Sequence, residues 1–103
     1  MGHEEFESEL GDVAVAQDHI ERRKSKSDKW SKIRETFSEN KLSDYIHYED
    51  VTSVEFEPGE MFPNIKVETE EGLKRVFFSG DDEARDCFDE LKYRLNVYRE
   101  NYM

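Results

Sequence analysis

One long apolar stripe at helical spacing constrains the fold of this chain more than any other feature. Its members recur every three or four residues: Ala84, Cys87, Phe88, Leu91, Leu95, Tyr98 and Tyr102. This period places them on one face of an α-helix of roughly 20 residues. Asp81 and Asp82 favour the start of that helix, because carboxylates cap and complement the positive end of a helix dipole. The helix must bury its stripe against another element.

The middle of the chain, from residue 44 to residue 78, follows a period of two instead. Apolar residues alternate with polar ones in short segments that contain Ile46, Tyr48, Val54, Phe56, Ile65, Val67, Val76 and Phe78. Pro58-Gly59 ends one segment, and Glu70-Glu71-Gly72 is typical of a hairpin turn. The pattern predicts three or four antiparallel strands, buried on one face and acidic on the other.

The first 44 residues carry weaker signals. Five residues lie three or four apart, as on one face of a helix: Phe6, Leu10, Val13, Gln17 and Ile20. Gly11 and the small residues after it weaken that helix, and a short strand over 13–16 is the alternative. Trp30, Ile33 and Phe37 follow helical spacing and predict a short helix over 28–39.

These patterns predict the α+β class: an antiparallel sheet packed by a long C-terminal helix, with one or two N-terminal helices. A length of 103 residues corresponds to a single domain with one modest core. We place that domain at residues 28–103. Residues 1–27 form an acidic and then basic segment, for which partial disorder and a docked helix are both open.

Charge divides the chain into three blocks. The formal net charge is −11, from 26 acids and 15 bases. Residues 1–21 carry net −7, residues 22–34 carry net +6, and residues 35–103 carry net −10. Strong acidity disfavours nucleic acid and anionic membranes as default partners. Carboxylates in excess over sparse lysines favour halophilic adaptation, in a salt-adapted cytosolic source, over an acidic binding surface.

The basic block is the strongest candidate for a binding site. Its residues are Arg22, Arg23, Lys24, Lys26, Lys29, Trp30, Lys32 and Arg34. Seven cations beside an aromatic ring could neutralise the phosphates of a nucleic acid or a lipid headgroup. The interpretation that we favour is that these bases pair with acids of the same chain or of a neighbouring copy. A solvated linker is the third alternative.

Motifs for catalysis, metal binding or cofactor binding are absent from the sequence. His3, His19 and His47 are scattered, and there is no HExxH or CxxC pattern and no glycine-rich phosphate loop. His47 is expected to face solvent, and Cys87 lies on the apolar stripe, where a buried small hydrophobe is expected. We therefore predict no enzymatic activity, no metal and no cofactor. The single cysteine fits a reducing compartment, and no apolar run is long enough for a transmembrane segment.

About half of the chain resembles a known family. Residues 45–56 read Tyr-Ile-His-Tyr-Glu-Asp-Val-Thr-Ser-Val-Glu-Phe. This stretch, the hairpin over 65–78 and the helix over 79–95 resemble the second half of the pleckstrin-homology-like (PH-like) domains of bacteria and archaea. The resemblance implies a half-barrel capped by a helix, and it brings no catalytic motif. Members of that family bind lipids, bind peptides or form assemblies.

Residues 1–44 depart from the PH-like pattern, which needs several strands there. Either helices replace those strands, or a partner chain completes the half-barrel, because an open sheet edge must be paired or protected. We therefore expect a small, non-catalytic, cytoplasmic PH-like domain that acts through protein–protein contacts, as a homodimer. The alternative is a module that binds a phosphorylated or polyanionic ligand through residues 22–34.

Overall fold

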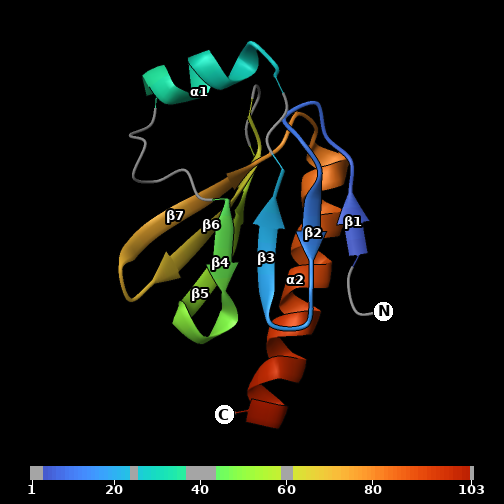
Figure 1. The fold of residues 1–103 in the computed structure, drawn as a ribbon, viewed down its shortest axis with the longest axis vertical. Coiled ribbons are helices and arrows are strands. Elements are labelled where there is room, and N and C mark those ends of the chain that lie inside the picture. Colours follow the sequence, from blue (N-terminus) through green and yellow to red (C-terminus); the bar gives the residue numbers. More distant parts are fainter. Residues whose placement is uncertain (1–3, 24–25, 37–43, 59–61, 103) are drawn as a thin grey trace.

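The computed structural model describes residues 4–23, 26–36, 44–58 and 62–102. Within them the chain forms seven strands, two α-helices and one short 3-10 helix (Figure 1). In chain order these elements are β1 (Glu4–Phe6), β2 (Val13–Val15), β3 (His19–Arg22), α1 (Lys29–Thr36), β4 (Tyr45–His47), η2 (Tyr48–Asp50), β5 (Val51–Glu57), β6 (Asn64–Thr69), β7 (Gly72–Phe77) and α2 (Asp81–Tyr102). The α+β prediction, with a long C-terminal helix on antiparallel sheets, is confirmed.

The strands form two antiparallel sheets. One has the order β1-β2-β3-β4, and the other has the order β5-β6-β7. In the first sheet Val15 pairs with Ile20, and His19 pairs with His47. The 3-10 helix η2 connects the two sheets, because it lies between β4 and β5 in the chain. The second sheet is the meander that the alternating pattern predicted.

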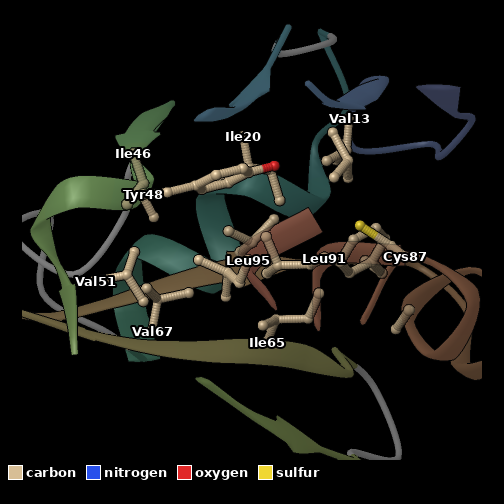
Figure 2. Close-up of a cluster of buried hydrophobic side chains, with 14 of the residues drawn as sticks. Val13, Ile20, Ile46, Tyr48, Val51, Ile65, Val67, Cys87, Leu91 and Leu95 are labelled. Carbon is tan, nitrogen blue, oxygen red and sulfur yellow. The ribbon is translucent and has the colours of Figure 1, made fainter. Parts of the chain in front are cut away.

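Helix α2 supplies the main core. Ala84, Cys87, Leu91 and Leu95 are all buried, as the stripe predicted. Figure 2 shows Leu91 and Leu95 lying between residues of the two sheets, with Ile20 on one side and Ile65 on the other. The helix therefore joins the sheets through one shared apolar cluster.

A smaller cluster lies under α1. Trp30 and Ile33 of α1 are buried together with Leu10 and Phe77. The next residue, Phe78, belongs to the main core. Both faces of the end of β7 are therefore covered, whereas the pattern predicted one buried and one acidic face.

The N-terminal segment differs from the helical alternative. Residues 4–22 contain three short strands, and the alternative of a strand near 13–16 is correct. Val13, Val15 and Ile20 lie in the main core with α2. The expectation that helices replace the missing strands is wrong for residues 4–22, because the chain supplies three strands of its own there. Completion of the half-barrel by a partner chain stays a prediction. The predicted helix over 28–39 is present as α1, which spans Lys29–Thr36. Residues 37–39 of the predicted range lie outside the described part of the chain.

Candidate functional site

The basic block does not form one surface. Arg22 ends β3, whereas Lys29, Trp30, Lys32 and Arg34 lie on α1. Arg22 and Trp30 are buried, with 6% and 5% of their surface exposed. Arg23, Lys26, Lys32 and Arg34 are exposed, Lys29 is half-buried, and Lys24 lies outside the described residues. Two members of the predicted site, Arg22 and Trp30, therefore lie in the protein interior, whereas four of its cations lie on the surface.

The Arg22 guanidinium lies between two aromatic rings in the protein interior. Its Cζ atom is 5.3 Å from the ring centroid of Trp30 and 5.3 Å from that of Phe78. The side-chain atoms Nε, Nη1 and Nη2 make no hydrogen bond. Burial disfavours the charged form and lowers the pKa of Arg22 to about 10. This guanidinium is a buried cation held by π-faces and is not presented to solvent.

Trp30 and Lys29 also make contacts within the chain. The indole Nε1 of Trp30 donates a hydrogen bond of 3.0 Å to the Leu10 carbonyl. Lys29 forms an ion pair with Glu9. Because Trp30 is also only 5% exposed, its indole offers no open face to a nucleotide base. One of the seven bases pairs with an acid of the N-terminal block. No described acid lies within ion-pair distance of the four exposed bases.

A second polar cluster, which the sequence did not indicate, lies on β3, β4 and their flanks. His19 and His47 are opposite each other in neighbouring strands. The Asp18 carboxylate approaches both imidazoles, at 2.7 Å from Nδ1 of His19 and 3.9 Å from Nε2 of His47. Tyr45 stacks on His19 with 4.7 Å between ring centroids. The hydrogen bond from His19 lowers the pKa of Asp18, because it stabilises the charged carboxylate.

Beside this cluster, two adjoining hollows run along the C-terminal half of α2. The larger, of about 420 Å³, is lined by Gln17, Tyr93, Arg94, Val97, Tyr98 and Asn101. The smaller, of about 300 Å³, is lined by Gln17, Asp18, His47, Glu49 and Tyr98. Because Gln17 and Tyr98 line both, the hollows form one groove. Tyr93 and Val97 on its rim are 62% and 36% exposed.

The single cysteine is not placed for chemistry. Cys87 is fully buried, as predicted, and burial raises the pKa of its thiol to about 12. The thiol is therefore protonated at neutral pH, and a thiol is a weak nucleophile. In the described part of the chain, no group of three histidine, cysteine or acidic side chains is placed to hold a metal ion.

No protein-family model, curated protein or solved structure matches this chain. Neither of the helices that the structure describes is both long and apolar enough to cross a bilayer.

Proposed function

We propose that this protein is a small non-catalytic interaction domain of PH-like architecture that associates with a second copy of itself in the cytosol of a salt-adapted cell. The observation that carries the proposal is the unpartnered face of α2. Tyr93 and Val97 lie one helical turn apart on it, beside the groove of about 420 Å³. Exposed tyrosine next to an apolar neighbour is typical of the centre of a protein interface.

The position of this face supports protein contact. The C-terminal turns of α2 extend beyond the ends of the strands, so a partner can approach them (Figure 1). Asp86 and Asp89, which lie before Tyr93 on the helix, are exposed and charged. Charged side chains beside an apolar centre are common in transient interfaces.

The order of the elements supports the PH-like part of the proposal. A PH-like barrel needs strands ahead of the half that residues 45–95 resemble, and β1, β2 and β3 precede it. Because the chain supplies these three strands itself, a dimer is not needed to provide them. The proposed contact therefore rests on α2 and not on an open barrel.

Size-exclusion chromatography with light scattering tests self-association, at several protein concentrations and in 0.15 M and 2 M NaCl. We expect the mass of a dimer for the wild type and that of a monomer for the Tyr93→Ser, Val97→Ser double variant. Tyr45→Ser is the matched control, since Tyr45 is 54% exposed and lies on β4. A monomeric wild type under every condition would refute self-association, and a dimeric double variant would place the contact elsewhere.

The exposed bases favour a second candidate, a module for a phosphorylated or polyanionic ligand. Arg23, Lys26 and Lys32 are exposed, and no described acid pairs with them. If they bind phosphates, the triple change to Glu should abolish retention on an anionic column at low salt. The change of Lys66, Lys74 and Lys92 to Glu alters the net charge equally and is the control. Equal retention of the two triple variants would contradict this candidate.

A further inference from the structure

His47 holds the backbone of the segment that connects the two sheets. Its Nδ1 atom accepts a hydrogen bond of 3.1 Å from the Glu49 backbone N–H, and His47 is the N-cap of η2. A backbone N–H can only donate, so Nδ1 must carry no proton in this arrangement. The hydrogen of the neutral ring is then on Nε2.

The 3-10 helix η2 in turn positions a central core residue. Tyr48 is buried in the main core, and its hydroxyl donates a hydrogen bond of 2.6 Å to the Ala16 carbonyl. Its backbone N–H donates to the Asp18 carbonyl at 2.9 Å. The Tyr48 ring meets Tyr98 of α2 edge-on, with 5.8 Å between centroids. A change at the cap therefore affects the turn between β2 and β3, which contains Ala16 and Asp18, and also affects α2.

Charged groups surround the His47 ring on several elements. Asp18 Oδ2 is 3.9 Å from Nε2, and Glu49 Oε2 is 3.9 Å from Nδ1. His19 is opposite in register, and Tyr98 packs edge-on at 5.9 Å between centroids. Asp50, Glu71 and Lys74 line a further hollow that His47 borders. The carboxylates outnumber the cations around the ring, so a protonated ring has ion-pair partners in place.

We propose that His47 is a pH-operated cap: a proton taken up from solvent at Nδ1 releases the Glu49 amide and turns the ring toward the carboxylates of Glu49 and Asp18. The proton occupies the lone pair that accepted the amide hydrogen, so the cap and the charged ring exclude each other. The freed amide then bonds to water. His47 lines the same groove as Tyr98 and Gln17. The proposed protonation of His47 is a property separate from the proposed self-association.

His19 responds to acid in the opposite sense. Its Nδ1 atom already donates to Asp18 at 2.7 Å, because an ionised carboxylate can only accept. A second proton on Nε2 would face Glu21 Oε2 at 3.8 Å and would break no hydrogen bond. Of two histidines opposite each other in register, one loses a bond on protonation and the other gains a partner. This difference makes His19 the matched control for His47.

Nuclear magnetic resonance on the ¹⁵N-labelled full chain between pH 8 and pH 5 tests the proposal. At pH 8 we expect His47 to carry its hydrogen on Nε2, with Nδ1 bare. On acidification Nδ1 should protonate, and exchange of the Glu49 amide, corrected for its intrinsic rate, should accelerate about fivefold, the factor for one net hydrogen bond. The two changes should share one midpoint.

Two substitutions separate the cap from general effects of pH. Asn at an N-cap accepts through its side-chain oxygen and does not titrate, so His47→Asn should hold the Glu49 amide equally at both ends of the range. His19→Asn should keep the wild-type pH response. A protonated Nδ1 at pH 8, a Glu49 amide that ignores pH in the wild type, or an unchanged response in His47→Asn would each overturn the proposal. The ring assignment needs only the wild type, so it decides even if a variant does not fold.

Discussion

Burial of the Arg22 charge both lowers and raises the stability of the folded protein: desolvation destabilises it, and contact with two aromatic rings stabilises it. Its three side-chain nitrogens make no hydrogen bond, and desolvation of such a cation costs several kcal/mol. The two aromatic faces return about 0.5–2 kcal/mol each. Because the cost is the larger, Arg22→Met should leave the free energy of unfolding unchanged or raise it by about 1–2 kcal/mol.

Urea denaturation measures this effect, with Arg23→Met as the control for an exposed neighbour. The control should change the free energy of unfolding by less than about 0.5 kcal/mol. A loss of more than about 2 kcal/mol in Arg22→Met would contradict the balance, and would mean that the two aromatic contacts outweigh desolvation.

Cys87 should make the folded protein less stable at alkaline pH. The folded state keeps the thiol protonated to a pKa of about 12, whereas the thiol of the unfolded chain titrates near pH 9. Above that pH the unfolded state binds fewer protons than the folded state, so stability falls as the pH rises. One pH unit above the unfolded pKa, the loss is about 1.4 kcal/mol.

Thermal unfolding between pH 8 and pH 10 measures this loss. The wild-type Tm should fall across the range, and Cys87→Ala should flatten that fall even though its cavity lowers Tm at pH 8. The range stops at pH 10 because Arg22 then begins to act in the opposite sense, since its pKa is lowered to about 10. Identical slopes for the two proteins would count against the buried thiol as the cause.

Among the elements, α1 is held to the molecule by two buried side chains. Trp30 and Ile33 are its buried residues, and they meet Leu10 and Phe77. We expect Ile33→Ala to lower the free energy of unfolding by about 2–5 kcal/mol, since it leaves a cavity in this small cluster. Fluorescence of Trp30, the single tryptophan, reports the transition directly. Lys32→Ala, on the exposed face of the same helix, should change little; equal losses in both variants would argue against the cluster.

The long elements were predictable from sequence, and the short ones were not. Helix α2 and the strands β5, β6 and β7 are long enough for a period to repeat several times. By contrast β1, β2 and β4 have three residues each. All three residues of β2 are buried, so it shows no alternation. In β3 the buried positions are Ile20 and Arg22. Arg22 is a charged residue, so the sequence pattern does not mark it as a buried position.

The candidate site was less predictable than the fold. The basic block stood out as charge, but charge does not reveal that β3 turns Arg22 inward or that Trp30 anchors α1. His19 and His47 are 28 positions apart and meet through the register of two short strands. No local pattern encodes such a register, so the polar cluster could only be found in three dimensions.

For the whole molecule, the charge of −11 makes stability depend on salt. At 0.1 M salt the acids repel one another over about 10 Å, and at 1 M salt over only about 3 Å. We therefore expect the Tm to rise from 0.1 M to 2 M KCl, an outcome that the proposed halophilic adaptation also implies. Sucrose at equal osmolality is the control, because it is excluded from the protein surface but does not screen charges. A Tm that stays constant or falls in KCl would contradict this prediction.

The composition of the main core determines how much of the chain must be synthesised before the protein can fold. Val13 and Val15 of β2 pack with Leu91 and Leu95 of α2, residues that are made nearly eighty positions later. During synthesis the early strands must therefore wait, with their apolar side chains uncovered, until α2 has left the ribosome. Closing so large a loop is slow, and a waiting strand is exposed to wrong pairing. Early β-hairpins that are short and flanked by acids reduce that hazard while the nascent chain is incomplete.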